Sequence, residues 1–209
     1  MRFLKTISFI AGLLALALLW AGPFLSTWQE SFAAHMFAHM GVVAIAAPLI
    51  SIGLSTRIAV KPFLVLIASL SELFVVWGWH LPAARLWATT SAFATILEQS
   101  MFLAAGLFLW LTALASADQS KESSASGALA LLLTSVHMTL LGALLSLASY
   151  PLFNVGEVTC FGLVLDASQD QALGGVIMLL AGAVVYLAGG VFLLSRLLSG
   201  ERQGKRVIR

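Results

Sequence analysis

Six long apolar stretches separated by shorter polar segments dominate the pattern of the chain. Each stretch contains the roughly 20 mostly apolar residues that an α-helix needs to cross the hydrocarbon core of a membrane. The predicted spans are Ile7–Leu25, Phe32–Leu54, Pro62–Leu81, Ser91–Ala113, Ala128–Ala148 and Gln171–Leu198. The pattern therefore predicts an all-α integral membrane protein, a bundle of about six transmembrane helices that forms a single membrane domain over residues 1–209.

Prolines and polar residues mark the irregularities of these spans. Pro62 lies where a first helical turn tolerates a missing donor, and Pro48 predicts a kink inside the second span. The polar, Ser-rich segment Ser116–Gly127 is predicted to be a short connecting loop. The longest connection is Tyr150–Ser168, which is long enough to hold structure or a binding role of its own.

The composition agrees with this class of protein. Of the 209 residues, 60% are hydrophobic and 10% are charged, whereas soluble domains average about 45–50% and 25%. This excludes a soluble enzyme, a nucleic-acid module and a secreted disulfide scaffold. Cys160 is the single cysteine and has no partner for an intramolecular disulfide. We expect it to be exposed in an outer loop, either as an unpaired bystander or as a transient thiolate ligand.

The basic residues predict the orientation of the protein in its membrane. If the N-terminus is cytoplasmic, Arg85 is the only one of the 11 lysines and arginines on the outer side. The inner set is Arg2, Lys5, Arg57, Lys61, Lys121, Arg196, Arg202, Lys205, Arg206 and Arg209. Both termini are therefore predicted to be cytoplasmic. No A-x-A-like cleavage site follows the first span, which we interpret as a retained signal anchor.

Ionisable side chains lie in the outer halves or near the middle of several spans. They are His35, His39, His80, His137, Glu72 and Glu98, with Asp170 at the outer mouth of the sixth span. Such groups are costly in lipid, so they usually face the interior of a helix bundle and mark a site. The helical rise puts His39 on the order of 10–12 Å, Glu98 about 10 Å and His137 roughly 15–18 Å below the outer surface. We expect these helices to converge on one pocket that is reached from outside.

The strongest local pattern is His35-Met36-Phe37-Ala38-His39-Met40. Residues i and i+4 share a helix face, so His35 pairs with His39 and Met36 with Met40. Imidazole and thioether groups form a ligand set suited to Cu(I). The predicted metal ligands are His35, His39, His80, His137, Met36 and Met40.

Structural roles for some of these residues remain open. His80 lies beside Trp79, where an aromatic belt at the membrane interface would also collect it. Methionine in a membrane helix usually serves packing. Glu72, Glu98 and Asp170 are possible relay or entrance groups, and either glutamate could equally pair helices or bind a metal.

Several motifs occur together in a fixed order. They are His35-Met36-x-x-His39-Met40, Trp79-His80-x-Pro82, Glu98 with Phe102, His137 with Gly142, and Asp170-Gln171-x-x-Gly174-Gly175-x-Ile177-Met178. Over roughly residues 28–195 this order resembles the polytopic CtaG family of bacterial cytochrome c oxidase assembly factors. The family pattern also leads us to expect a histidine beside Glu98, where Gln99 stands.

The resemblance implies a protein of the bacterial inner membrane that helps to mature a haem–copper oxidase. It implies copper handling at the outer face, with oxidase subunits as partners besides the membrane lipid, and no enzymatic activity. It also makes His35, His39, His80 and His137 candidate ligands, with Asp170 at the entrance.

Two other functions fit the same residues. A b-type haem electron carrier would use a pair such as His39 and His137 as axial ligands. A copper or proton transporter would use Glu72 and Glu98 as relays, although the inner halves of the spans are almost free of ionisable groups. A metalloprotease is excluded because no H-E-x-x-H motif is present, and four histidines are too few for a membrane diiron hydroxylase.

Overall fold

The computed structural model describes residues 2–22, 27–28, 30–54, 59–117, 120–153 and 156–207. Six helical spans in this part of the chain are long and apolar enough to cross a membrane. They are α1 (Arg2–Ala21), α3–η1–α4 (Phe32–Gly41, Val42–Ala46, Ala47–Leu54), α5 (Pro62–Trp79), α7 (Ala92–Ser116), α8 (Lys121–Ser146) and α9–η2–α10 (Ala167–Ala181, Gly182–Tyr186, Leu187–Val207). The predicted all-α membrane bundle is confirmed.

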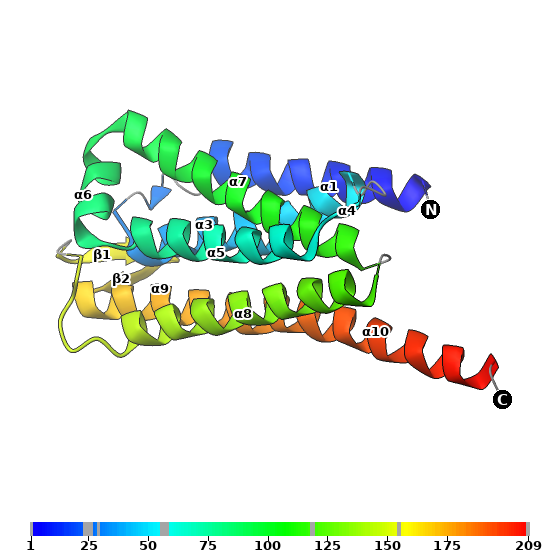
Figure 1. Cartoon of the computed structure of the whole chain (residues 1–209). Coiled ribbons are helices and arrows are strands. Elements are labelled where there is room, and N and C mark those ends of the chain that lie inside the picture. The colour runs from blue at the N-terminus through cyan, green and yellow to red at the C-terminus, as the bar shows by residue number, and fades with distance from the viewer. Residues whose placement is uncertain are drawn as a thin grey trace.

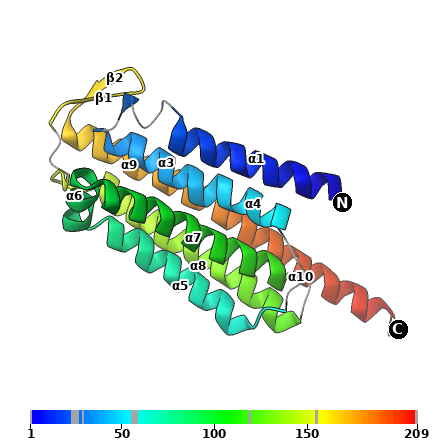
Figure 2. The same cartoon turned by 90° about the horizontal axis from the view of Figure 1, so that it is seen from above.

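The spans lie side by side, and the connections between them gather at two opposite ends (Figure 1). One end carries the short helix α6 (Pro82–Thr90) and the strands β1 (Val158–Cys160) and β2 (Leu163–Leu165), and we name it the hairpin end. The other end holds the start of α1 and the end of α10 (Figure 2). Arg85 of α6 thus lies at the end opposite the two termini, as the charge pattern predicts; Arg57 and Arg209 lie outside the described residues.

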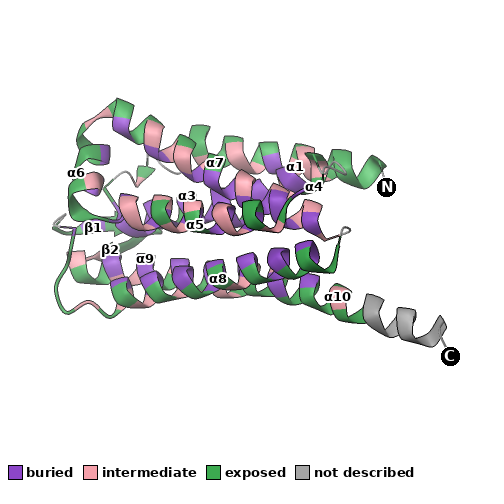
Figure 3. Cartoon of the chain, in the orientation of Figure 1, coloured by how far each residue is buried: buried purple, intermediate pink, exposed green. Residues whose placement is uncertain are grey.

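Burial follows the bundle interior (Figure 3). Only 6% of the apolar window of α1 is buried inside the protein, whereas 67% of the window of α3–η1–α4 is buried. The first span therefore presents most of its apolar surface outward, as a helix in contact with lipid would. The second span lies at the centre of the bundle.

The Ser-rich segment Ser116–Gly127 is helical over most of the length that was predicted to be a loop. Helix α7 continues to Ser116 and α8 begins at Lys121, where the side chain of Ser120 caps its first turn. The hydroxyl of Ser124 donates to the backbone carbonyl of Ser116. Because these hydroxyls find carbonyl acceptors, polar residues are accommodated within the helix ends, and the connection between α7 and α8 is shorter than predicted.

The long connection between α8 and α9 contains structure that the span pattern does not predict. Strands β1 and β2 pair antiparallel, with Val158 opposite Leu165. Phe161 and Gly162 have φ values of 50° and 81°, as the two-residue turns of tight hairpins require. The expectation that Cys160 is exposed is wrong: the hairpin packs on the start of α3, where Cys160 is buried against Ala33 and Ala34. Burial also raises the pKa of the Cys160 thiol, which disfavours a thiolate ligand.

The second span contains the π-helical turn η1 just before Pro48, the residue at which the sequence predicts a kink. There the N–H of Ala47 bonds the carbonyl of Val42, five residues back. The carbonyl of Val43 then has no helical donor, because Ala47 is already used and Pro48 has no N–H. Side chains of other helices supply the missing donors, as described below.

Helices α8 and α9 approach each other closely at two of the glycines in the recurring motifs. A Cβ atom on Gly142 would lie 2.6 Å from the backbone nitrogen of Leu179, and one on Gly175 would lie 2.6 Å from that of Ser146. Both positions therefore require glycine for packing. Small residues at such contacts are typical of helix pairs in membranes.

Candidate metal centre

Three buried side chains at the hairpin end converge on one small volume. The Nε2 atoms of His35 and His39 lie 2.6 Å apart, and the Oε1 atom of Glu98 lies 3.1 Å and 3.4 Å from them. His35 is 9%, His39 0% and Glu98 1% exposed. One ligand atom from each residue falls within a 4.8 Å group, which is compact enough to surround a single metal ion.

The local sequence positions these three side chains on two helices. His35 and His39 are one turn apart on α3, and their rings meet edge to face with centroids 4.0 Å apart. Glu98 and Phe102 are one turn apart on α7. The Phe102 ring stacks on His39 at 4.0 Å and 15°, so an apolar side chain from the same face of α7 holds the imidazole in place.

The hydrogen-bond pattern of this cluster cannot be satisfied by protons alone. His35 Nε2 has three close neighbours, because Nη1 of Arg85 also lies 2.8 Å from it. A guanidinium only donates and a carboxylate only accepts, so no tautomer of His35 suits both. Among the described residues, His39 Nδ1 and Glu98 Oε2 also have no hydrogen-bond partner. Lone pairs that converge in this way fit a cation as their common partner.

A second pair of donor atoms lies beside the first group. His80 Nδ1 donates to the carbonyl of Val76 at 2.6 Å, which leaves a lone pair on Nε2. That atom lies 3.0 Å from the thioether sulfur of Met36, which cannot donate a proton. An imidazole nitrogen facing a thioether suits a soft metal ion. The His80 ring also lies 6.4 Å from that of Phe102, which links this pair to His39.

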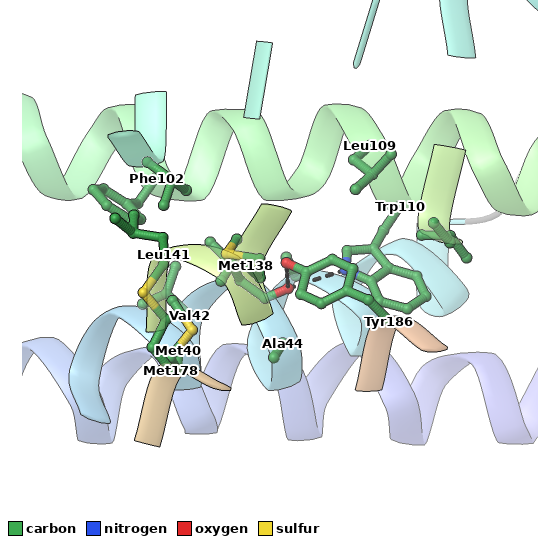
Figure 4. Packing of buried hydrophobic residues seen from close by; sticks show 14 of the residues in the cluster. Met40, Val42, Ala44, Phe102, Leu109, Trp110, Met138, Leu141, Met178 and Tyr186 are labelled. Atoms are coloured by element: carbon green, nitrogen blue, oxygen red, sulfur yellow. Dashed lines mark hydrogen bonds between the residues drawn. The ribbon is translucent and has the colours of Figure 1, made fainter. Parts of the chain in front are cut away.

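Two of the predicted ligands lie elsewhere. His137 of α8 is buried but is not part of the group of three, and neither of its ring nitrogens has a hydrogen-bond partner among the described residues. Met40 packs in the apolar core with Met138 and Met178 (Figure 4). The structure therefore brings together His35, His39 and Glu98, with His80 and Met36 beside them.

Asp170 lies at the hairpin end, but its carboxylate is fully engaged. It accepts hydrogen bonds from the hydroxyl of Ser31 at 2.7 Å and from the backbone N–H groups of Phe32 at 2.6 Å and Ala33 at 3.1 Å. A carboxylate at a helix N-terminus stabilises the first turn. This geometry fixes the start of α3, and hence the histidines that follow, more directly than it forms an entrance.

Glu72 belongs to a separate polar network deeper in the bundle. Its Oε1 lies 2.7 Å from the hydroxyl of Tyr186, which lies 3.2 Å from the carbonyl of Val43. Trp110 donates to the same carbonyl at 3.0 Å, and its ring stacks on Tyr186 (Figure 4). These two side chains supply the donors that Pro48 and the π-helical turn leave missing.

Comparison with protein families gives a match over nearly the whole chain. The family described as cytochrome c oxidase caa3 assembly factor (Caa3_CtaG) matches residues 1–64 and 54–199. The chain belongs to this family. Neither the curated proteins nor the solved structures that were compared with it include a match.

Membership in the caa3 assembly-factor family agrees with the resemblance inferred from the ordered motifs. Gln99, which stands where we expected a histidine, accepts a hydrogen bond from the indole of Trp20 at 3.0 Å and so ties α7 to α1. Gln171 accepts from the backbone of Leu152 and donates to the carbonyl of Leu145. Both glutamines therefore have packing roles.

Sequence reasoning missed three residues of these networks. Arg85 stood out only as the single basic residue on the outer side, and that isolation was a usable signal. Tyr186 and Trp110 carried no signal, because the carbonyl that they satisfy is exposed only by the π-helical turn.

Proposed function

We propose that this member of the caa3 assembly-factor family holds Cu(I) for a haem–copper cytochrome c oxidase that is being assembled. The convergence of lone pairs from His35, His39 and Glu98 at one buried point carries the proposal. His80 and Met36 provide further ligands as the ion enters or leaves. Copper is cargo in this proposal, and the protein acts by ligand exchange and not as an enzyme.

The donor set suits a monovalent copper ion. With two neutral imidazoles and one carboxylate, the donor set carries a single negative charge that balances the charge of Cu(I). The neighbouring thioether favours a soft ion. The position near the hairpin end suits transfer to an oxidase subunit on the outer side of the bacterial inner membrane. This direction follows the charge pattern, which assigns the termini to the cytoplasm.

The haem alternative receives less support from the geometry. It needs two histidines on facing helices, and His39 with His137 was the available pair. His39 instead contacts His35 of its own helix and Glu98, whereas His137 is outside the group.

The decisive experiment is an anaerobic Cu(I) titration of the detergent-purified protein against a chromophoric chelator. We expect one tightly held copper and no Soret band. His39→Ala should weaken binding far more than Met178→Leu, a buried methionine outside the cluster, and X-ray absorption should show nitrogen or oxygen neighbours. Equal, negligible losses in both variants would contradict the ligand assignment, and a Soret band without copper would favour haem.

The proposed orientation can be tested separately. We expect activity from a reporter that works only in the cytoplasm when it is fused after Arg209. A fusion that is active only in the periplasm would place the metal centre on the wrong side for the proposed transfer.

A further inference from the structure

Arg85 is a buried cation in direct contact with the candidate metal centre. It lies on the short helix α6 at the hairpin end and is 9% exposed. Its Nη1 atom lies 2.8 Å from Nε2 of His35. Buried arginine is rare unless it is paired, so its position requires an explanation.

This contact uses the same lone pair that a metal ion would need. A guanidinium has five N–H donors and no acceptor, so His35 Nε2 must accept from Arg85 in this arrangement. An imidazole nitrogen that accepts this hydrogen bond cannot coordinate a metal at the same time. Contact with Arg85 and coordination through His35 Nε2 therefore exclude each other.

Charge balance leads to the same conclusion. The charge of Arg85 is attracted by the carboxylates of Glu98 and Asp170. The charge of Asp170 is already stabilised by the backbone N–H groups of Phe32 and Ala33. Glu98 is then left to balance one positive charge, which is either the guanidinium or a monovalent metal ion. Both together would leave a buried charge without a partner, which is strongly unfavourable.

The position of α6 allows such an exchange. The helix connects α5 to α7 and is anchored through Trp87, which stacks on Trp79 at 5.8 Å, and through Thr95, whose hydroxyl donates to the carbonyl of Ala88. The face of α6 that carries Leu86 and Thr89 is exposed and is not covered by other described residues. A change of side-chain rotamer toward this exposed face would take the guanidinium out of the site.

We propose that Arg85 is a built-in competitor of the metal ion, occupying the cation position of the empty site and withdrawing when Cu(I) binds. This inference rests on the proposed copper site and adds its regulation. Return of the guanidinium would help to release the ion at the hairpin end. Exchange of one single charge for another would also favour Cu(I) over divalent ions.

The first test compares Cu(I) affinities by the same chelator competition. Arg85→Leu removes the charge and adds no metal ligand, and Arg196→Leu, at an exposed arginine of α10, is the matched control. We expect Arg85→Leu to bind Cu(I) roughly tenfold more tightly or better, with the control unchanged. An unchanged or weaker affinity in Arg85→Leu would overturn the inference. Arg85→Gln, which is also neutral, replaces the leucine variant if that variant does not fold.

The second test reads the withdrawal directly in the wild-type protein. A water-soluble dicarbonyl reagent that modifies arginines is applied with and without Cu(I), and peptides are analysed by mass spectrometry. Arg85 should be protected in the empty protein and reactive in the loaded one, whereas the reactivity of Arg196 should not change. Protection of Arg85 in the loaded protein would overturn the inference while leaving the copper site intact. Absence of Cu(I) binding in both folded wild-type and Arg85→Leu proteins would instead refute the proposed function itself.

Discussion

Two buried glutamates in neighbouring parts of the bundle have opposite surroundings. Glu98 is 1% exposed and Glu72 is 0% exposed. Glu98 lies beside His35 and His39 and within the field of Arg85, so cationic or metal-binding groups surround it. Glu72 meets the hydroxyl of Tyr186, and its Oε2 has no hydrogen-bond partner among the described residues.

The difference shows that burial and residue type do not assign a role to a carboxyl group in a membrane. A charged carboxylate at this depth needs a positive partner, and Glu98 has one. Glu72 instead accepts a hydrogen bond from the hydroxyl of Tyr186, which is a neutral group. Glu98 is therefore arranged for a cation, and Glu72 for a hydrogen bond within the scaffold.

Charge removal at the two glutamates should separate these roles most strongly. Glu98→Gln should weaken Cu(I) binding by more than the roughly 10–100-fold that is typical of removing a group that only orients a ligand. Glu72→Gln keeps the shape and an oxygen that accepts from Tyr186, so its Cu(I) affinity should equal that of the wild type in the same titration. A comparable loss in both variants would show that the two carboxyl groups belong to one functional path.

The network of Glu72, Tyr186 and Trp110 has a scaffold role, which predicts a change of intermediate size in the free energy of unfolding. Trp110→Phe removes one donor to the buried carbonyl of Val43 and should destabilise the protein by about 1–3 kcal/mol in denaturation measurements in micelles. Pro48→Ala restores an N–H to the helix, so the same tryptophan substitution should cost less in that background. An identical cost with and without Pro48 would contradict the link between the π-helical turn and the side-chain donors.

Asp170 provides a smaller effect at the hairpin end. Asp170→Asn keeps the shape but removes the charge at the N-terminus of α3, at an expected cost of about 1 kcal/mol in stability. Because Asp170 acts on the helix and not on the ion, the Cu(I) affinity should fall far less than in Glu98→Gln. A loss of affinity as large as that of Glu98→Gln would return Asp170 to the role of an entrance or ligand.

The sequence predicts the spans well because bilayer thickness constrains the length of each apolar run. It also predicts the pairing of His35 with His39, since helical geometry alone places them on one face. The helical rise per residue, however, gives only the depth of a residue along the membrane normal. His137 was assigned a depth near the site, yet it is not in the group of three. Depth says nothing of the rotation of a helix about its own axis or of its place in the bundle. Those quantities depend on packing, which one sequence does not reveal.

The contact between Arg85 and His35 could not be predicted for a related reason. Helix α6 begins at Pro82, in a segment that the sequence pattern assigns to a connection between spans, and its packing against α5 and α7 is not visible in the sequence. Cys160 was misplaced in the same way, because the hairpin that buries it forms by pairing two short strands within the connection.

The smallest expected effect concerns Cys160, the one soft ligand that the structure places away from the site. It is buried against Ala33 and Ala34, and burial raises the pKa of its thiol above the ordinary value of 9.0. The thiolate fraction at neutral pH is therefore lower than in the unfolded chain, where alkylation should be fast. Cys160→Ala should leave the Cu(I) affinity unchanged, and alkylation of the folded wild-type protein should be slow at pH 7 and accelerate only at more alkaline pH. Rapid alkylation at pH 7 that Cu(I) blocks would instead make Cys160 a ligand, and the comparison of the two glutamates would then describe only part of the metal path.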